Sequence, residues 1–270
     1  MIGVAEDLLT GKASVALVRI TRVRGSAPRE EGAWMLVSGE AVAGTIGGGQ
    51  LEYMAIDQAR ACLSGGDAAV MDVPLGPEIG QCCGGRVELS VSVLDAAGRK
   101  AFLATLHREQ DHRPHVYLFG AGHVGRALAV ALDPLPVRCV VIDTRAEELA
   151  LVPGHIETRL TAMPEAEVRA APFGSAFVVL THDHALDFLI VQEALTWGEA
   201  AYVGMIGSAT KRAQFESWLR RQPGAPDAEA LVCPIAQAGP QDKRPEVIAA
   251  FAATEIFAAV AQFSRVEAEA

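Results

Sequence analysis

Residues 116–125 read VYLFGAGHVG, and this stretch decides the fold of the second half of the chain. Its first four residues are apolar and predict a buried β-strand, and the glycine-rich turn that follows opens a helix-like segment. In such a turn Gly120 permits a tight bend, Gly122 lets a pyrophosphate approach the backbone, and Gly125 allows the helix to pack closely on the strand. The pattern predicts a Rossmann-like unit, whose turn either holds a nucleotide or needs its glycines for structural reasons alone.

The sequence around this turn alternates between strand-like and helix-like segments. Further apolar strands are predicted at residues 138–143, 176–182 and 200–207. Nearly continuous apolar strands separated by helices indicate a parallel sheet covered on both faces. Asp143 ends the first of these strands, about 20 residues after the glycine turn, where a carboxylate can accept hydrogen bonds from ribose hydroxyls.

The first half of the chain has a different sequence pattern. Short β-like runs lie between residues 15 and 93, separated by Gly and Pro, and one helix is predicted at residues 50–63. A helix-like stretch with a polar end, residues 95–113, is interpreted as the linker. We therefore expect an α/β protein with a smaller N-terminal β-rich α+β domain, residues 1–112, and a C-terminal Rossmann-like parallel-sheet domain, residues 113–270.

Composition narrows the classes of partner. The chain has 270 residues with 23 Lys and Arg and 33 Asp and Glu, so its formal net charge is −10. This charge argues against nucleic acid or an anionic membrane as a partner, and no stretch reaches about 18 consecutive apolar residues. The N-terminus is unlike a secretory signal. The five cysteines are an odd number and lack the regular spacing of a disulfide-bonded domain, which indicates reduced thiols. We expect a cytoplasmic protein and, from the apolar helix at residues 247–263, a homodimer.

A second glycine turn, TIGGG at residues 45–49, precedes the predicted helix of the first half. The backbone N–H groups of Gly47, Gly48 and Gly49 can point at an anion, and the helix dipole adds to the attraction. The alternative is a hairpin or bulge that needs glycine for its positive φ angles. Because other glycine turns accompany it, we favour the anion-binding interpretation.

A third turn, GMIGS at residues 204–208, follows a predicted strand. Gly207 and Ser208 lead into a helix whose first turn carries Lys211, and Ser208 is a suitable N-cap. Cations near a helix N-terminus oppose the dipole unless an anion compensates them. The turn therefore fits either a bound anion or a capped surface helix with solvated charges.

The segment THDH, residues 181–184, ends an apolar strand and lies where ligands bind in open α/β sheets. His182 and His184, with Asp187 one turn later, suit a metal site, a proton shuttle or a ligand clamp. The structural alternative is that Asp183 begins the next helix and His184 packs locally.

The hexapeptide GQCCGG, residues 80–85, is the most unusual in the chain. Its glycines free the backbone to expose Cys82 or Cys83, and a thiol beside backbone donors can bind a soft metal or carry sulfur. The alternative is two small apolar residues buried in a glycine-rich turn. We take Cys82 and Cys83 as the candidate metal ligands.

With these motifs, the chain resembles the XdhC/CoxI family, accessory proteins of molybdenum hydroxylases such as xanthine dehydrogenase. The resemblance covers nearly the whole chain: RGSAPREEGAWMLV, GTIGGGQLE and GQCCGGRVEL in the first half, and FGAGHVG, THDHALD, GMIGS and CPI in the second. The ordered set is specific, above all GTIGGGQLE and GQCCGG ahead of the Rossmann segment. Two positions depart from the family pattern: Ala236 stands where Gly is expected, and Phe251 where Ser is common.

The resemblance implies a non-catalytic or barely catalytic role in maturation, and we assign no catalytic residue. Family members bind molybdenum cofactor, protect it during sulfuration by a NifS-like cysteine desulfurase, and insert it into the apo-hydroxylase. The hypothesis is that the two domains close a cleft in which Cys82 or Cys83 faces the metal. Glycine turns at helix N-termini would hold the anionic end, so the candidate cofactor-binding residues are Gly47, Gly48, Gly49, Cys82, Cys83, Gly120, Gly122, Gly125, Asp143, His182, Gly207, Ser208 and Lys211.

Two other classes of function fit parts of the sequence. An NAD(P)-dependent oxidoreductase would use the Rossmann turn and Asp143, with His182 or His184 as proton donor. A pure interaction module would dock a desulfurase to an apo-enzyme and hold no small ligand.

Overall fold

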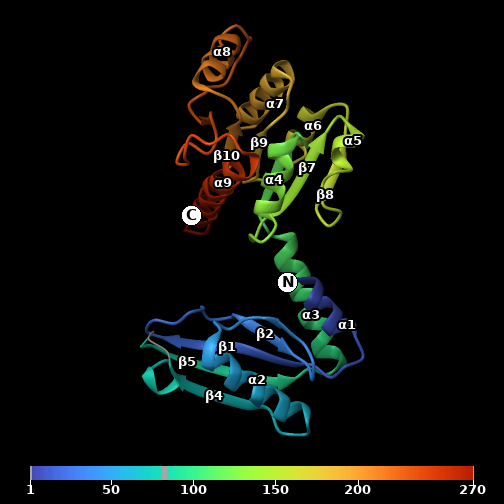
Figure 1. Ribbon diagram of the computed structural model, residues 1–270, viewed down its shortest axis with the longest axis vertical. Helices are drawn as coiled ribbons and strands as arrows, with labels where there is room; N and C mark the ends of the chain where they lie inside the picture. The colour runs from blue at the N-terminus through green and yellow to red at the C-terminus, as the bar shows by residue number, and fades with distance from the viewer. Residues whose placement is uncertain (1, 81–83, 270) are drawn as a thin grey trace. The chain divides into compact units, whose positions relative to one another are not determined.

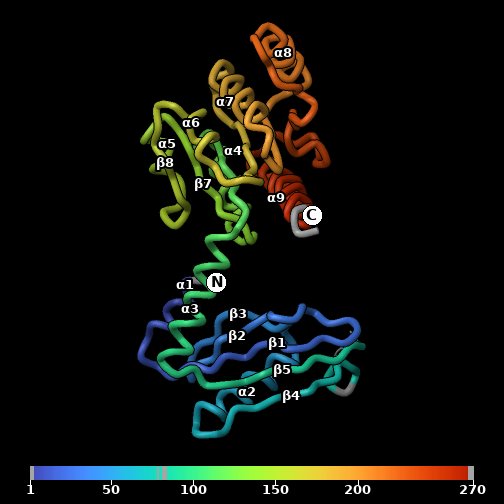
Figure 2. Tube along the Cα trace, turned by 180° about the vertical axis from the view of Figure 1, so that it is seen from behind, coloured from blue at the N-terminus to red at the C-terminus, as the bar shows by residue number. Residues whose placement is uncertain are grey.

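The computed structural model describes residues 2–80 and 84–269. It divides into two compact units, Met1–Asp111 and His112–Ala270, a division one residue before the expected boundary. Figures 1 and 2 show an antiparallel sheet in the first unit and a parallel sheet flanked by helices in the second. The expected fold class is therefore confirmed.

The first unit is built on a five-stranded antiparallel sheet in the order β3-β2-β1-β5-β4. Its elements are α1 (Ile2–Thr10), β1 (Ala16–Arg24), β2 (Trp34–Val37), β3 (Val42–Gly44), α2 (Gly49–Leu63), β4 (Ala69–Pro74), a 3-10 turn (Pro77–Ile79), β5 (Arg86–Val93) and α3 (Ala96–Asp111).

Helices cover both faces of this sheet because the side chains of β1 alternate between them. Val18 and Ile20 pack with α2, whose apolar residues recur at helical spacing and are buried: Leu51, Ala55, Ala59 and Cys62. On the other face, α1 and α3 pack on the sheet through Leu9, Leu36 and Phe102. The ring of Phe102 lies edge-on to Trp34, 5.2 Å between centroids.

The second unit is a six-stranded parallel sheet in the order β11-β10-β9-β6-β7-β8. Its elements are β6 (His115–Phe119), α4 (His123–Leu132), β7 (Arg138–Asp143), α5 (Ala146–Leu149), β8 (Glu157–Leu160), α6 (Pro164–Arg169), β9 (Ala176–Val179), α7 (His184–Trp197), β10 (Tyr202–Met205), α8 (Ala209–Leu219), β11 (Leu231–Val232) and α9 (Pro245–Glu269).

Two layers of helices enclose this parallel sheet. Helices α4 and α9 pack together on one face, and α6, α7 and α8 cover the other (Figure 1). The chain runs from β6 outward through β7 and β8, and then resumes on the other side of β6 with β9. The strand order therefore reverses between β6 and β9, which is where ligands bind in this kind of sheet.

Helix α9 contains the apolar segment expected at residues 247–263. One face is buried in the core of the second unit through Ala249, Ala252, Ala253, Ile256 and Val260. Residues 245–266 are also long and apolar enough to cross a membrane, as the core helix of a soluble protein can be.

Candidate functional site

The glycine turn after β6 has the close contacts that its sequence predicts. Gly120 has a φ of +122°, and a Cβ on Gly125 would lie 1.9 Å from the carbonyl oxygen of Gly120. Both glycines are therefore required by the fold itself. Gly122 differs, because its φ is −66° and a Cβ there would meet nothing within 4 Å. The fold does not explain this glycine, and it leaves open space at the first turn of α4.

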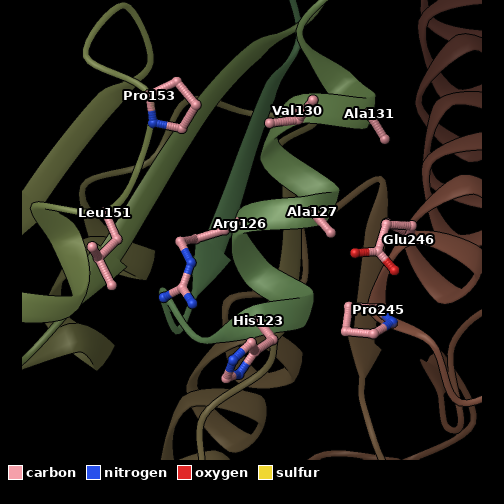
Figure 3. A pocket seen from close by; sticks show the side chains of 10 residues that line it. His123, Arg126, Ala127, Val130, Ala131, Leu151, Pro153, Pro245 and Glu246 are labelled. Atoms are coloured by element: carbon pink, nitrogen blue, oxygen red, sulfur yellow. The ribbon is translucent and has the colours of Figure 1, made fainter.

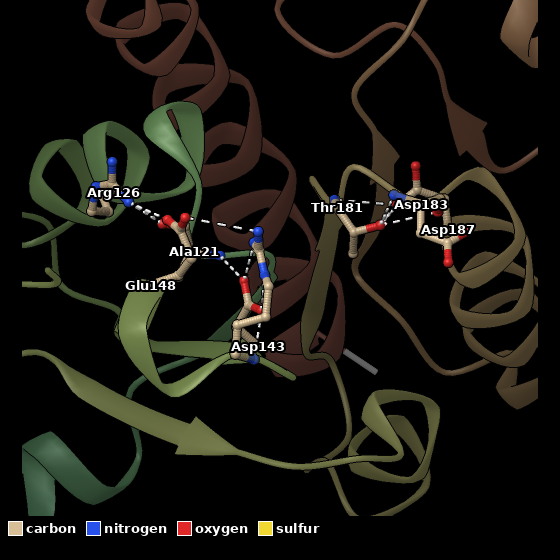
Figure 4. A network of polar contacts seen from close by, with 8 residues as sticks. Ala121, Arg126, Asp143, Glu148, Thr181, Asp183 and Asp187 are labelled. Atoms are coloured by element: carbon tan, nitrogen blue, oxygen red, sulfur yellow. Dashed lines mark hydrogen bonds and ion pairs between the residues drawn. The ribbon is translucent and has the colours of Figure 1, made fainter. Parts of the chain in front are cut away.

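Asp143, at the end of β7, is 6% exposed and makes four hydrogen bonds within the chain. Its Oδ2 accepts from the backbone N–H of Ala121 at 2.7 Å, and its Oδ1 accepts from the N–H of Arg145 at 3.0 Å (Figure 4). The Arg145 guanidinium adds bonds of 3.0 Å to Oδ1 and 2.9 Å to Oδ2. Burial raises the pKa of Asp143, but these bonds together outweigh it and hold the pKa below its ordinary value.

The carbonyl oxygen of Ala121, like its N–H group, is hydrogen-bonded to a side chain. Arg126 Nη1 donates to Ala121 O at 2.6 Å and to Glu148 Oε2 at 2.7 Å (Figure 4), and Arg145 Nη1 lies 3.8 Å from Glu148 Oε1. Asp143, Arg145, Glu148 and Arg126 therefore form a closed ring of contacts around Ala121. In this arrangement the carboxylate expected to receive a ribose is already engaged.

Gly120, Asp143 and His182 come together at the point where the strand order reverses. With Arg145 and Thr181 they line a cavity of about 20 Å³, a volume that suits one water molecule and is too small for a nucleotide ring. A Cβ on Gly120 would lie 3.0 Å from the N–H nitrogen of Thr181, so the glycine turn and the THDH segment are in direct contact.

A buried ion pair joins the THDH segment to the GMIGS turn. Asp187 is fully buried, and its Oδ1 accepts from the Thr181 hydroxyl at 2.6 Å (Figure 4). Lys211 Nζ donates to Asp187 Oδ2 and, at 3.0 Å, to Ile206 O. A Cβ on Gly207 would lie 2.7 Å from Lys211 Cδ, so this glycine leaves room for the lysine side chain.

The anion that compensates Lys211 is thus a carboxylate of the chain. Ser208 is the N-cap of α8, and its Oγ accepts from Lys211 N at 3.3 Å. Gly207, Ser208 and Lys211 lie together at the start of α8, and the Lys211 ammonium group binds Asp187 and the carbonyl of Ile206.

The two histidines of THDH belong to no metal-binding group of described residues. Asp183 caps α7, with Oδ1 accepting from Ala185 N at 2.8 Å, and the His184 ring stacks on Phe188. His182 is exposed. Within residues 2–80 and 84–269, no three His, Cys, Asp or Glu side chains are grouped so that they could hold a metal ion.

In the first unit, the TIGGG turn holds a carboxylate of its own chain. Glu52 Oε2 accepts from the Thr45 hydroxyl at 2.7 Å and from the N–H groups of Ile46 at 3.2 Å and Gly48 at 3.0 Å. Gly47, Gly48 and Gly49 all have positive φ, at 125°, 79° and 66°. Glu52 was not predicted from the sequence, although an acidic residue in the first turn of a helix is favoured by the helix dipole and is a signal for contacts with nearby N–H groups.

Three motif segments far apart in the sequence meet near this turn. A Cβ on Gly47 would lie 2.4 Å from Pro28 Cγ, and a Cβ on Gly85 would lie 2.1 Å from Ser26 O. Residues 25–28 therefore contact both the TIGGG turn and the end of the GQCCGG hexapeptide. Cys82 and Cys83, the predicted metal ligands, lie outside the described residues.

The three cysteines that the structure does describe are free thiols in apolar surroundings. Burial raises the pKa of Cys139 to about 12. Burial also raises the pKa of Cys233, with Lys211 and Arg212 opposing it in part. The thiol of Cys62 donates to Asp67 O at 3.0 Å. With pKa values above the ordinary range, Cys139 and Cys233 make poor thiolates.

A larger hollow of about 540 Å³ lies over the outer face of α4 (Figure 3). Its floor is apolar, with Ala127 and Val130 from α4 and Leu151 beside it, and His123 and Glu246 lie at its edge. None of the described residues predicted from the sequence lines this hollow.

The fold and its glycine-rich clusters define a two-unit α/β protein whose Rossmann unit carries a turn held by its own side chains. Residues 116–256 match the XdhC Rossmann domain, and residues 8–74 match the XdhC and CoxI family. The chain belongs to the XdhC/CoxI family, which confirms the resemblance.

Two known proteins show how far the likeness extends. A crystal structure from Bacillus halodurans described as a xanthine dehydrogenase aligns over 97% of this chain and 96% of its own, with a TM-score of 0.77 and 17% identity, and it supports the fold. The uncharacterized protein YqeB of Escherichia coli is 27% identical over 228 residues, 77% of this chain. The chain spans 36% of the length of that relative.

Proposed function

We propose that this protein binds molybdenum cofactor as cargo, supports its sulfuration by a NifS-like cysteine desulfurase, and inserts it into an apo-hydroxylase such as xanthine dehydrogenase. The observation that carries the proposal is the meeting of three family motifs in the first unit. Pro28 touches Gly47, and Ser26 touches Gly85 at the end of the cysteine hexapeptide.

The chemistry of the cargo suits thiols better than carboxylates, because molybdenum bound through sulfur is a soft centre. Cys82 and Cys83 are the proposed ligands. The high pKa values of Cys139 and Cys233 support this choice, since a thiol must deprotonate to bind a metal.

Within the second unit, the turn before α4 is the proposed site for a phosphate group. Open space beside Gly122 lets a phosphate approach the first N–H groups of this helix, where the dipole favours an anion. Lys211 already has a carboxylate partner, so in this proposal it holds the GMIGS turn in position.

The alternative, an NAD(P)-dependent oxidoreductase, is disfavoured by the hydrogen bonds that Asp143 already makes and by the small cavity beside it. Its oxygens are engaged by Ala121 and Arg145, and the cavity beside it is about 20 Å³. A nicotinamide nucleotide would have to displace the Arg145 side chain before its ribose could bind.

The test is reconstitution with anaerobically purified full-length protein. Molybdenum cofactor released from a molybdoenzyme is added, and its retention on gel filtration and the activation of apo-xanthine dehydrogenase with a cysteine desulfurase are measured. Cys82→Ala, Cys83→Ala and the double variant should lose retention and activation, and the buried-thiol control Cys139→Ala should keep both. Unchanged retention and activation in the double variant would overturn the cysteine assignment. Turnover with NADH or NADPH, or retention of these nucleotides alone, would overturn the accessory function.

Two further expectations accompany the proposal. We place the protein in the cytoplasm with its hydroxylase and desulfurase, and we expect it to be a homodimer. Sedimentation equilibrium at micromolar concentration measures the second directly.

A further inference from the structure

A second cavity, of about 560 Å³, lies in the first unit where the end of α1 meets the start of α3. Three leucines, Leu9, Leu94 and Leu103, give it an apolar wall. All the charged residues that line it are cations, namely Lys12, Arg99 and Lys100.

The two lysines of this cavity are unusual in the chain. The sequence contains only four lysines, and two of them line this one cavity. Both are exposed, and neither ammonium has a hydrogen-bond or ion-pair partner within residues 2–80 and 84–269. The cavity therefore presents two uncompensated positive charges in a protein whose net charge is −10.

Arg99 plays a different part. Its Nη1 donates to Gly11 O at 2.9 Å and its Nη2 to Ala13 O, so the guanidinium ties the end of α1 to α3. The arginine is a fixed part of the wall, while the lysines remain free to move toward a ligand.

Lys100 is the fifth residue of α3, beyond the first turn of the helix. Asp95, directly before α3, is engaged by Gly98 N at 2.6 Å and does not line the cavity. Nothing among the lining residues neutralises Lys12 and Lys100.

We propose that this cavity binds an organic anion with an apolar body. A carboxylate or phosphate monoester would lie between the ammonium groups of Lys12 and Lys100, and a hydrocarbon chain or ring would cover Leu9, Leu94 and Leu103. Its volume falls within the range of small-molecule sites. The site is independent of the cargo site proposed above, because it uses none of the same residues.

The test is isothermal titration of the full-length protein with octanoate and with octyl phosphate, which distinguish the two anionic head groups. Octanol supplies the apolar body without charge, and inorganic phosphate supplies charge without the apolar body. Saturable binding of one amphipathic anion, at least about tenfold tighter than octanol or phosphate and weakened by added salt, is expected. Equal binding of octanol would overturn the role of the lysines, and equal binding of inorganic phosphate would overturn the role of the leucines.

Variants assign the binding to this cavity. Lys12→Gln with Lys100→Gln should weaken it about tenfold. The matched control is Lys243→Gln, which removes an exposed lysine from the second unit and should leave binding unchanged. Because all three lysines are exposed, these changes should not disturb folding, which far-UV circular dichroism verifies. Undiminished binding in the double variant, or equal loss in the control, would refute the proposal.

Discussion

The Arg145 guanidinium donates a hydrogen bond to each oxygen of the Asp143 carboxylate, from Nε to Oδ1 at 3.0 Å and from Nη2 to Oδ2 at 2.9 Å. The same carboxylate accepts from Ala121 N, so this pair also fixes the glycine turn of the Rossmann unit. Arg145, two residues beyond the position predicted to bind a ribose, is thus part of the wall of the turn.

Replacing Arg145 by Ala should lower the free energy of unfolding by about 1–3 kcal/mol, because a nearly buried carboxylate loses two charge-assisted bonds. Urea unfolding at pH 7 measures this. Arg138→Ala is the matched control, since its partner Glu157 is 32% exposed and such surface pairs contribute about 0–1 kcal/mol. Equal losses in the two variants would show that the Asp143 pair is an ordinary surface contact.

The same pair should make stability depend on pH. The pKa of Asp143 in the folded protein lies below its ordinary value, so the carboxylate stabilises the fold above that ordinary value, about 3.9. This stabilisation is lost as the pH falls through the folded-state pKa. The difference in unfolding free energy between wild type and Arg145→Ala should therefore be full at pH 6 and smaller at pH 3. A difference that does not change with pH would contradict the assignment.

Removing the cation of the buried pair should be costly. Lys211→Met leaves Asp187 buried without its counter-charge, and such losses are about 3–5 kcal/mol. Combining Lys211→Met with Asp187→Leu should recover part of the loss, because no lone charge then remains. Lys243→Met, at an exposed position, should change little. Calorimetric melting of the four proteins distinguishes a structural ion pair from a solvated lysine.

Glu52 offers a test of the TIGGG turn. Glu52→Gln keeps a side-chain oxygen that can accept from Thr45, Ile46 and Gly48. Glu52→Ala removes this oxygen, so the three hydrogen bonds to it are lost. We expect a loss of about 1–3 kcal/mol for Ala and clearly less for Gln. Hydrogen exchange at Gly48 should accelerate most in the Ala variant, and identical exchange in both variants would show that another group holds the turn.

Ala236 is the non-glycine residue with a positive φ, 61°, among the residues that the structure describes. This is the position where the resemblance led us to expect Gly. The left-handed conformation costs an alanine about 1–2 kcal/mol, which the greater chain entropy of glycine offsets in part. Ala236→Gly should therefore raise the melting temperature by about 2–4 °C, whereas Ala238→Gly, two residues on, should not raise it. A lower melting temperature for Ala236→Gly would contradict this account.

Local sequence patterns predicted the inner strands, the edge strand β3 and the main helices, but they missed the edge strands β4 and β8. The apolar run at residues 116–119 marks β6, which lies between two strands. Strands β4 and β8 went unpredicted because they lie at sheet edges and alternate between partly buried and exposed residues. Their pairing depends on neighbours distant in the sequence.

In the candidate site, too, the local sequence predicted the roles of some residues and not of others. The need for Gly120 and Gly125 is local, since it follows from the turn itself, and Ser208 and Asp183 are caps as their positions suggest. The carboxylates that occupy two of the glycine turns were harder to predict: Asp143 lies 22 residues from Ala121, and Glu52, although four residues from Gly48, folds back onto the turn before its helix. Sequence spacing shows that a turn attracts an anion, but only the folded structure shows which carboxylate reaches it first.

An incoming anion at either turn must therefore compete with a carboxylate tethered a few ångströms away. A tethered group acts as if present at millimolar or higher effective concentration, so the turn binds an external ligand more weakly than its donors alone would allow. When that ligand leaves, Glu52 or Asp143 can return to its donors, and the internal bonds re-form. For a protein proposed to pass its cargo to another, this exchange lowers the barrier to hand-over without any external source of energy.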